Sequence, residues 1–461
     1  MLTLQDILES KDQRCNHRNL FHHKYPNSCI ISITLNIPGP IKDSDLLRKF
    51  FQSAMTHLQK LFPQHTASTY YYEKTGPHGL MAIPLNALEV KKQTVYLEEK
   101  YTYSRLWDID VYDINEQQIS SEKRKNGRRC LLCQQQAVVC MREHHHTMKD
   151  ILYKVDDLLL QFQADSYKNL SPVAKLIAQH ATRAALYEAA SFPSPGLVDP
   201  IHTGSHHDMD FYTFINSSCS LYDWFGCFVE AGIQYRGTLK AFFKLLKIVG
   251  INAEHSMYTA TNQVNTHKGL IFSMGLLLGS IGKILQENQP LSSYTIISMI
   301  KKISAGITVE LKNDKVPSTS GEKFYKLYGI TGIRGEAEKG FPAIFNYGLP
   351  TLKKELESGE PINKVLIQTL FTIICVTDDT TILCRQPNIN ILKKVKKQAK
   401  NILDNKTFEK ENWQNPIQQL DKEWISLNLS PGGSADLLAL TYLVYDLLYG
   451  QLHKLISISK H

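Results

Sequence analysis

The sequence predicts an α+β protein in which a small α+β domain, residues 1–165, precedes a larger all-α domain, residues 166–461. Three patterns predict this organisation. Apolar and polar residues alternate in short runs within the first third, which is typical of half-buried strands. After about Met148 this alternation almost disappears, and the apolar spacing becomes helical. Residues 269–282 carry no charge, which favours a helix that is buried on all sides.

Length and composition are those of an ordinary globular protein. The 461 residues suffice for two or three domains, and 43% hydrophobic with 21% charged residues exclude a disordered or fibrous chain. A net charge of +8 suits anionic partners such as nucleotides, coenzymes or an acidic protein, and does not by itself imply nucleic acid. The nine cysteines are an odd number, so we expect free thiols in a reducing cytoplasm. Charged residues interrupt the first turns, which argues against a secretory signal.

The first domain is expected to begin with a polar helix that ends near residue 25. Ile31, Ile33 and Leu35 alternate with polar residues and predict a strand, which ends before Pro38. The remaining expected elements are a helix from Asp43 or Ser44 to Phe62, strands at 68–72, 80–83 and 94–101, and helices over 148–165 and 171–190. The helix over 148–165 is expected to connect the two domains.

Two aspartates lie in the segment Arg105–Val111. In an extended strand Asp108 and Asp110 point to one side, and the apolar residues that flank them point to the other. Neighbouring carboxylates in an apolar strand repel each other unless a cation lies between them. Mg²⁺ held by two carboxylates and phosphate oxygens is the arrangement expected for phosphoryl and nucleotidyl transfer. The alternative is an edge strand with two solvated aspartates.

Basic and metal-binding residue types follow this strand. The basic residues are Lys123, Arg124, Lys125, Arg128 and Arg129, which fit a polyphosphate, an acidic partner or a plain solvated face. The metal-binding types are Cys130, Cys133, Cys140 and the histidines at 144–146, which could hold Zn²⁺. Only one Cys-x-x-Cys pair is present, and the residues around Cys140 suggest a helix through it. We therefore favour buried thiols that line a core.

Polar residues come directly before the uncharged run of the second domain. Asn265 or Thr266 can cap the helix there, and Lys268 adds a positive charge at the end where free N–H groups favour an anion. This is a phosphate site in outline, without the glycine-rich half of a Walker A loop. The uncharged run has 14 residues, fewer than the ~20 that a membrane span needs. Three glycines share one face, where another backbone can approach: Gly275, Gly279 and Gly282.

Five polar segments separate the helices expected in the second domain. They are Pro195–Asp210, Glu254–Lys268, Ser318–Glu338, Asp378–Arg385 and Ser430–Asp436. Acids stand beside glycines in these segments, which suits metal binding and close approach of a ligand to the backbone. Gly432, Gly433 and Ser434 lead into a helix and form a second candidate anion site. Capped helix ends are the alternative for each segment.

These segments, in this order, resemble the triphosphoribosyl-dephospho-coenzyme A synthase family. The resemblance extends from about residue 171 to the C-terminus and is carried by five motifs. They are Pro195-Gly-Leu-Val-Asp199, Gly204-Ser-His-His-Asp-Met209, Val264-Asn-Thr-His-Lys-Gly269, Gly332-Ile-Arg-Gly-Glu336 and Ser430-Pro-Gly-Gly-Ser-Ala-Asp436.

The first third is similar to the phosphoribosyl-dephospho-coenzyme A transferase that charges the acyl carrier protein of citrate lyase. The similarity is carried by Thr34-Leu-Asn-Ile-Pro-Gly-Pro40, Arg105–Val111 and Arg129-Cys-Leu-Leu-Cys133. The whole chain therefore looks like a fusion of the two enzymes. The resemblance implies a nucleotidyltransferase-like first domain.

The resemblance implies that the second domain joins the ribose C1 of ATP to the ribose 2′-hydroxyl of 3′-dephospho-coenzyme A and releases adenine, with Mg²⁺ as cofactor. The expected catalytic residues are Asp208, Asp210, Glu254 and His206, and the three acids are also the expected metal ligands. The expected substrate-binding residues are Asn265, His267, Lys268, Arg334, Glu336, Asp379, Gly432, Gly433 and Ser434. One shared cavity is expected to hold Asp208, Glu254, Lys268 and Arg334.

The resemblance implies that the first domain transfers phosphoribosyl-dephospho-coenzyme A to a serine of the citrate lyase acyl carrier protein, its gamma subunit, and expels diphosphate. Asp108 and Asp110 are the expected metal ligands, with Arg105 beside the polyphosphate. No nucleic acid or membrane partner is expected. Two alternatives stay open: the carrier protein of malonate decarboxylase, or a non-catalytic, zinc-bearing basic scaffold that binds RNA or protein.

Some positions depart from the family pattern. Gln263 replaces a glycine, Thr381 stands where asparagine is favoured, and Ser194 stands where Lys or Arg is usual. In the first domain Ser104 and Ser121 replace a glycine and an arginine. The acidic and Asn-Thr-His-Lys cores are intact, so the resemblance implies activity.

Overall fold

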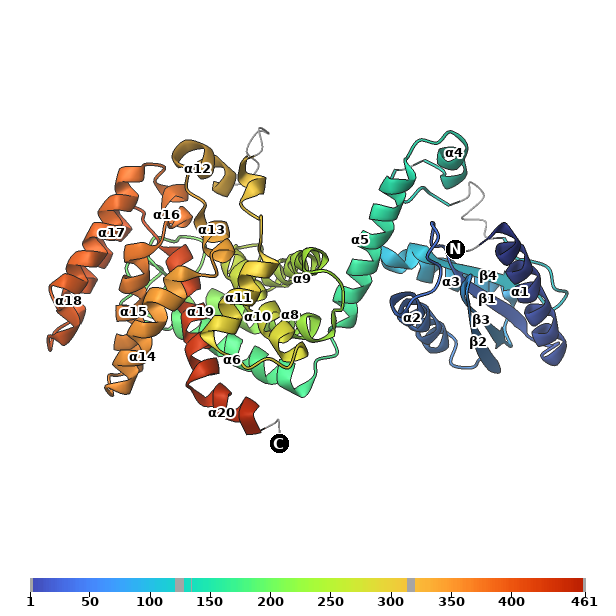
Figure 1. Cartoon of the computed structure of the whole chain (residues 1–461), viewed down its shortest axis with the longest axis horizontal. Coiled ribbons are helices and arrows are strands. Elements are labelled where there is room, and N and C mark those ends of the chain that lie inside the picture. Colours follow the sequence, from blue (N-terminus) through green and yellow to red (C-terminus); the bar gives the residue numbers. More distant parts are fainter. Residues whose placement is uncertain (1–2, 121–127, 134, 313–319, 459–461) are drawn as a thin grey trace. The chain divides into compact units, whose positions relative to one another are not determined.

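The computed structural model describes residues 3–120, 128–133, 135–312 and 320–458. The chain divides into two compact units, Met1–Asp165 (unit 1) and Ser166–His461 (unit 2), which we describe separately (Figure 1). Unit 1 combines one sheet with helices, whereas the described part of unit 2 is helical and contains no strand. The α+β class of the first domain and the all-α class of the second are confirmed.

The sheet of unit 1 is antiparallel, with strand order β2-β3-β1-β4. Its strands are β1 (Cys29–Leu35), β2 (Ala67–Glu73), β3 (Gly76–Ile83) and β4 (Trp107–Tyr112). The helices of unit 1 are α1 (Leu4–Lys24), α2 (Asp45–Leu61), α3 (Ala87–Lys100), α4 (Ala137–Arg142) and α5 (Met148–Ser166), with a 3₁₀ turn at Tyr103–Leu106. Strand β1 pairs with β3 on one side and β4 on the other, so the first strand in the chain is central.

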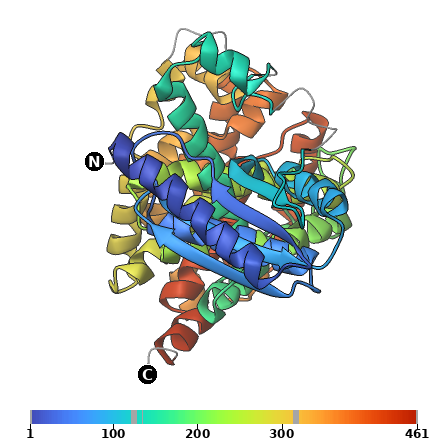
Figure 2. The ribbon, with the colours of Figure 1, turned by 90° about the vertical axis from the view of Figure 1, so that its right-hand side faces the viewer.

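The two faces of the sheet are covered differently. Helix α1 crosses one face (Figure 2), where Phe21 and Tyr25 pack against Ile30 of β1. The opposite face carries the larger core, built with α2, α3 and α5. Val155 and Phe162 of α5 belong to this core, so α5 is part of unit 1 rather than a bare connection. Each fully buried side chain of this size contributes about 1.5–3 kcal/mol, so this face supplies most of the hydrophobic stabilisation.

The strand predicted at residues 94–101 is wrong, because these residues form the end of α3. Asn86 starts the helix, and its side-chain oxygen accepts a hydrogen bond from the Leu88 N–H at 3.0 Å. Val90, Thr94 and Leu97 are buried at helical spacing. A short apolar run fits either period, and here the helix cap and the core contacts decide in favour of the helix.

The helices of unit 2 begin at the predicted α6, where the Ser171 hydroxyl accepts a hydrogen bond from the Ala174 N–H. They are α6 (Pro172–Ala189), α7 (Phe211–Ser220), α8 (Tyr222–Gln234), α9 (Leu239–Ala260), α10 (Lys268–Gln286), α11 (Ser293–Ile303), α12 (Ser320–Tyr328), α13 (Gly332–Glu338), α14 (Leu349–Glu357), α15 (Ile362–Val376), α16 (Thr380–Arg385), α17 (Ile389–Asp404), α18 (Gln414–Ser426), α19 (Gly432–Leu448) and α20 (Gln451–Ile458). A π-helical turn, Ala343–Gly348, precedes α14, and short 3₁₀ turns lie at Val309–Lys312 and Thr407–Glu409.

Helix α10 is the central helix of unit 2 and carries the predicted glycine face. A Cβ atom added at Gly282 would lie 2.2 Å from the carbonyl oxygen of Val229 on α8. One added at Gly232 of α8 would lie 2.5 Å from the carbonyl oxygen of Gly279. Gly275 faces a phenyl ring instead of a backbone. The glycines therefore let the backbones of α8 and α10 touch, as the spacing predicted.

By length and apolar composition α10 would also suit a membrane crossing. However, 78% of its apolar window is buried inside unit 2. Its apolar surface is used by neighbouring helices, so α10 is a core helix.

We expect Gly282→Ala to destabilise unit 2 by about 1–3 kcal/mol, because the added methyl group has no space between the two backbones. Gly250→Ala on α9 is the matched control. A Cβ atom there meets nothing closer than 3.8 Å, so alanine should be neutral or stabilise the helix by up to ~1 kcal/mol. Thermal unfolding followed by circular dichroism measures both variants, and equal transition temperatures would contradict the close approach.

Candidate active sites

A cavity of about 310 Å³ in unit 2 gathers four of the five polar segments. Its wall contains residues of Pro195–Asp210, Glu254–Lys268, Asp378–Arg385 and Ser430–Asp436, together with Glu188 from α6 and Phe214 from α7. The segment Ser318–Glu338 contributes no described residue to this wall. Segments that are far apart in the sequence therefore meet at the N-terminal ends of α10 and α19.

The N-terminus of α10 forms one side of the cavity. The Asn265 side chain accepts a hydrogen bond from the Lys268 N–H at 3.2 Å, as the capping prediction required. Lys268 Nζ lies 3.0 Å from a carboxylate oxygen of Glu254, and this hydrogen bond raises the pKa of Lys268. Glu254 itself does not line the cavity. Lys268 therefore carries a positive charge at the cavity that is paired with Glu254, while 56% of its side chain is exposed.

His267 is buried in the same wall. Its Nδ1 lies 2.6 Å from the Ser217 hydroxyl, which accepts a hydrogen bond from the Thr266 hydroxyl at 2.7 Å. Its Nε2 has no hydrogen-bond partner among the described residues. Burial lowers the pKa of His267 to about 4, so the ring is neutral. Because the Ser217 oxygen already accepts from Thr266, its own hydrogen can point to Nδ1, which leaves Nε2 as the N–H donor.

Arg385 lines the cavity beside His206, and it was not among the site residues expected from the sequence. Its Nη1 donates to the Ser205 carbonyl and the Asn428 side chain, both at 2.6 Å. Its Nη2 lies 3.0 Å from Nδ1 of His206. Burial and then the charge of Arg385 lower the pKa of His206 to about 4, so His206 is neutral. Asp208 lies 3.8 Å from His206, but its side chain is 64% exposed and lies outside the cavity wall.

Two acids, Glu188 and Asp436, also line the cavity. Burial raises the pKa of Glu188 to about 8. Burial, and then the charges of Glu188 and Asp379, raise the pKa of Asp436 well above its usual value. A Cβ atom added at Gly269 would lie 2.2 Å from the Asp436 carboxylate, so this acid packs against the start of α10. The cavity thus combines an acidic pair with the cationic side chains of Lys268 and Arg385.

Asp379 fills the second candidate anion site. It is buried at the start of α19, where the Ser434 N–H donates to its carboxylate at 2.7 Å and the Ser434 hydroxyl at 2.8 Å. The Gly433 N–H is 3.3 Å from the same carboxylate. The N–H groups of Gly433 and Ser434, which were predicted to bind a substrate phosphate, therefore bind the carboxylate of Asp379 instead. Of this turn, Gly432 lines the cavity.

Three other expected site residues lie outside the cavity wall. Asp210 is the N-cap of α7, where its Oδ1 accepts a hydrogen bond from the Thr213 N–H at 2.8 Å. Glu336 accepts one from the Ala343 N–H at 3.1 Å. Arg334 has a buried Nη1 without a hydrogen-bond partner among the described residues. The expected shared cavity therefore contains Lys268, but not Asp208, Glu254 or Arg334.

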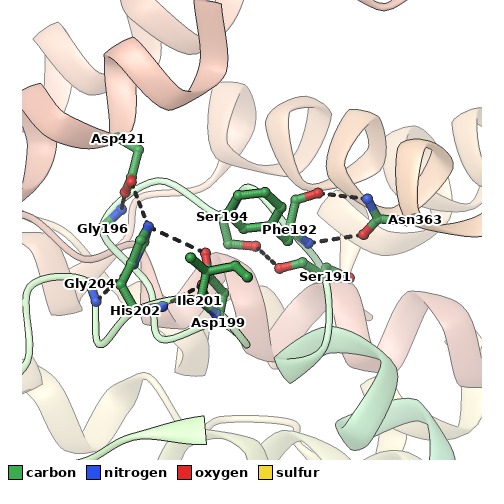
Figure 3. A network of polar contacts seen from close by, with 10 residues as sticks. All are labelled: Ser191, Phe192, Ser194, Gly196, Asp199, Ile201, His202, Gly204, Asn363 and Asp421. Carbon is green, nitrogen blue, oxygen red and sulfur yellow. Dashed lines mark hydrogen bonds and ion pairs between the residues drawn. The ribbon is translucent and has the colours of Figure 1, made fainter. Parts of the chain in front are cut away.

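The Pro-Gly-Leu-Val-Asp motif shapes the cavity wall through a hydrogen-bonded loop (Figure 3). Asp199 accepts hydrogen bonds from the N–H groups of Ile201 and His202 at 2.8 and 3.0 Å. His202 also lies 2.9 Å from a carboxylate oxygen of Asp421, which accepts a bond from the Gly196 N–H at 2.9 Å. The two apolar residues between Gly196 and Asp199 line the cavity. Asp199 and Asp421 thus hold the wall in position.

The departures from the family pattern fit their surroundings with one exception. The Ser194 hydroxyl donates to the Ser191 carbonyl at 2.6 Å, and the Thr381 hydroxyl donates to the Ser430 carbonyl at 2.9 Å. Gln263 is the exception, because its φ of 69° is a left-handed conformation that favours glycine. Ser121 lies outside the described residues.

In unit 1, the aspartates of β4 lie on one face of the strand as predicted, and the residues that alternate with them, Trp107, Ile109 and Val111, are buried. Asp108 forms an ion pair with Arg128 at 2.7 Å, and Arg128 also lies 2.5 Å from Glu98. Gln118 donates a hydrogen bond of 2.8 Å to Asp110. Burial, and then the charge of Asp108, raise the pKa of Asp110. The cations near this pair of aspartates are thus Arg128 and, at Asp110, Lys91.

A larger cavity of about 850 Å³ lies in unit 1, and Arg105, Arg128 and Arg129 line it, whereas Asp108 and Asp110 do not. Arg105 donates hydrogen bonds to the carbonyl groups of Arg129 and Cys130 at 2.9 and 3.0 Å. It therefore holds the basic segment against the sheet. The other predicted basic residues, Lys123, Arg124 and Lys125, lie outside the described residues.

The predicted metal-binding types of unit 1 come together. One potential ligand atom from each of Cys130, Cys133, Cys140 and His146 lies within 4.8 Å of the others. Cys140 lies on α4, the helix that the sequence suggested. All nine cysteines of the chain are described, and each is a free thiol, as predicted.

Comparison with known protein families covers both units. Residues 174–454 match the family described as CitG: ATP:dephospho-CoA triphosphoribosyl transferase. Residues 2–162 match the family described as CitX: apo-citrate lyase phosphoribosyl-dephospho-CoA transferase.

Curated relatives share the same two-part organisation. The chain is 32% identical to Protein CitXG of Leuconostoc mesenteroides subsp. cremoris over 95% of its length and 96% of the relative. It is 31% identical to Protein CitXG of Haemophilus influenzae over 95% of both chains. Over 59% of its length it is 38% identical to a probable 2-(5''-triphosphoribosyl)-3'-dephosphocoenzyme-A synthase of Lactiplantibacillus plantarum, of which 96% is covered. The chain therefore belongs to the CitXG family of bifunctional transferases, with a CitX unit followed by a CitG unit.

Proposed function

We propose that the protein carries out two successive transfers that make the prosthetic group of citrate lyase. Unit 2 joins the ribose C1 of ATP to the 2′-hydroxyl of 3′-dephospho-coenzyme A and releases adenine. Unit 1 transfers the product to a serine of the acyl carrier protein and releases diphosphate. The family descriptions name these two activities. The observation that carries the assignment of unit 2 is its cavity, which combines acidic and cationic side chains beside a helix N-terminus.

The cationic wall of this cavity suits the triphosphate of ATP. Lys268 and Arg385 supply two positive charges from different segments, and the start of α10 adds its free N–H groups. The neutral His267 can donate from Nε2 to a phosphate oxygen. The donors are held by Glu254, Ser217 and the Ser205 carbonyl, so little reorganisation is needed on binding.

The acidic pair suits the chemistry at the ribose. The 2′-hydroxyl oxygen forms a bond to C1 while the bond from C1 to adenine breaks, and adenine leaves with the electron pair and takes up one proton, which balances the proton that the hydroxyl loses. Glu188, with a pKa of about 8, can accept the hydroxyl proton at neutral to mildly basic pH. Asp436, which a bound cation would keep ionised despite its raised pKa, would stabilise positive charge that develops on the ribose.

Mg²⁺ is part of the proposal for unit 2. Its preferred ligands are carboxylate and phosphate oxygens. Burial, and then the nearby charge of Glu188, raise the pKa of Asp436, and a divalent cation beside Asp436 would favour its ionised form. The donor set therefore fits, and we propose that Asp436 and the phosphate oxygens hold the ion in place of Asp208, Asp210 and Glu254, whereas Glu188 stays unbound and acts as the base. When bound, Mg²⁺ would neutralise part of the triphosphate charge.

We propose that the arginine-lined cavity of unit 1 binds the polyphosphate of the intermediate, and that the unit has a nucleotidyltransferase-like fold. Arg105, Arg128 and Arg129 supply the positive charge. Asp108 and Asp110 remain the proposed Mg²⁺ ligands, since both are carboxylates on one face of β4. The attacking hydroxyl belongs to the carrier protein, so unit 1 needs no nucleophile of its own.

We propose the citrate lyase carrier as the acceptor, because the description of the CitX family names citrate lyase. The carrier of malonate decarboxylase is the alternative substrate. The nine free thiols favour a reducing compartment, and we propose the cytoplasm.

Asp436→Asn should lower the rate of adenine release from ATP and 3′-dephospho-coenzyme A by at least ~100-fold, because the cavity loses one of its two carboxylates. The matched control is Asp223→Asn on the exposed start of α8, which should retain the wild-type rate. Chromatographic detection of free adenine measures both. Wild-type release by Asp436→Asn would refute the role of the acidic pair.

The rate of adenine release should rise with pH and level off above about 8. Burial raises the pKa of Glu188 to that value, so the carboxyl group is protonated, and unable to accept a proton, at lower pH. A pH profile of kcat/KM for 3′-dephospho-coenzyme A measures this dependence. Glu188→Gln should abolish this rise along with most of the activity; an unchanged profile in the variant would contradict the assignment.

Arg128→Gln should lower kcat/KM for charging of the carrier protein by about 100-fold, because a charge-assisted contact to the polyphosphate is removed. Arg142→Gln, on the exposed end of α4, is the matched control. Transfer of labelled prosthetic group to the purified carrier measures charging, and adenine release by unit 2 should be normal in both variants. Equal charging by the two variants would argue against the arginine-lined cavity as the site.

A further inference from the structure

Three thiols and one imidazole converge at one end of unit 1. The Sγ atoms of Cys133 and Cys140 are 3.4 Å apart, and Nε2 of His146 is 3.4 Å from Sγ of Cys133. In a tetrahedral zinc site, Zn–S distances of about 2.3 Å and Zn–N distances of about 2.0 Å separate neighbouring ligand atoms by ~3.5–3.8 Å. These two separations are within a few tenths of an ångström of those in a metal site, and all four ligand atoms lie within 4.8 Å of one another.

The backbone around the first two cysteines supports the same conclusion. The Leu132 N–H donates to Sγ of Cys130 at 3.4 Å, a contact that stabilises a thiolate. The Cys130 N–H donates to the Gln135 carbonyl at 2.7 Å, so the backbones of these two residues lie side by side. The sulfur atoms of Cys130 and Cys133 lie close to the sulfur atom of Cys140 on α4 and to the ring of His146.

In this segment two thiols are buried and two larger apolar side chains are exposed, which is unusual for a protein core. Cys130 and Cys140 are buried, whereas Val138 is 45% exposed and Met141 is 64% exposed. Helix α4 has only six residues, which is too short to be stable by itself. Leu131 packs against the core of unit 1, but Val138 and Met141 of α4 are exposed, so hydrophobic burial explains little of why α4 folds here. A bond to a central ion does explain it.

A disulfide bond would explain the cluster less well than a metal ion does. It would join two of the sulfur atoms at about 2.05 Å and leave the third thiol and the imidazole without a role. The four side chains, spaced as Cys-x₂-Cys-x₆-Cys-x₅-His, match instead the Cys₃His set of structural zinc sites. We infer that Cys130, Cys133, Cys140 and His146 bind one Zn²⁺ ion, which closes all four coordination positions and acts as a structural centre.

The position of this centre links it to the arginine-lined cavity. Arg129 directly precedes the first ligand, and Arg105 donates hydrogen bonds to the carbonyl groups of Arg129 and Cys130. The Ala137 N–H donates to the Arg128 carbonyl at 2.7 Å, which ties α4 to the same segment. The zinc centre would therefore hold Arg128 and Arg129 at the cavity. The metal site does not depend on the proposed function, but this consequence for carrier charging does.

Metal analysis of the full-length chain tests the inference. The protein is produced in zinc-supplemented medium without a polyhistidine tag, and its metals are measured by mass spectrometry. We expect about one zinc per chain. Cys133→Ser and His146→Ala should reduce bound zinc to background. The matched controls Cys219→Ser and His145→Ala should keep it, because Cys219 is exposed in unit 2 and His145 is paired with Glu143.

Two further measurements keep the test decisive if a variant is unstable. Replacement of zinc by Co²⁺ in the wild-type protein should give thiolate-to-cobalt charge-transfer absorption. Adenine release by unit 2 should be normal in the ligand variants, whereas carrier charging should be lost. Zinc-free wild-type protein, or full zinc in Cys133→Ser, would overturn the inference. A zinc-loaded wild type that fails to charge the carrier would support the metal site and count against the proposed function of unit 1 alone.

Discussion

The contact between the backbones of α8 and α10 is the constraint on which unit 2 depends. Glycine at 232 and 282 removes the side chains that would otherwise separate the two helices, so α10 can lie at the centre of the unit. The start of α10 is then fixed where α6, α16 and α19 contribute their own cavity residues. The phosphate-binding end of one helix thereby acquires acids and an arginine from other segments. The close packing of α8 against α10 therefore helps to determine which residues line the cavity.

Features that depend on neighbouring residues in the sequence could be predicted. The cap at Asn265, the glycine face of α10, the side-to-side alternation of β4 and the helix through Cys140 all follow from local spacing. Glu188 and Arg385 could not be identified in this way. Glu188 lies in an ordinary amphipathic helix. It becomes a cavity residue because the fold brings Asp436, from the last polar segment, to the same cavity.

The ligand of a polar turn at the start of a helix cannot be predicted from local sequence either. Its free N–H groups bind any suitable anion, and the sequence does not say whether this anion is a substrate phosphate or a carboxylate of the same chain. At α10 the free end faces the cavity, whereas at α19 Asp379 takes the donors and joins α16 to α19. The role of Arg128 is equally hard to predict from the sequence. It forms ion pairs with Asp108 and Glu98 and also lines a cavity where it can bind a ligand.

The left-handed backbone at Gln263 has a consequence for engineering of the protein. A side chain in this conformation costs roughly 1–2 kcal/mol relative to glycine. This cost falls two residues before Asn265, where the cavity wall begins, so packing elsewhere in unit 2 must offset it. Replacement of Gln263 by glycine would remove the cost and would give a more stable starting point for changes to the cavity.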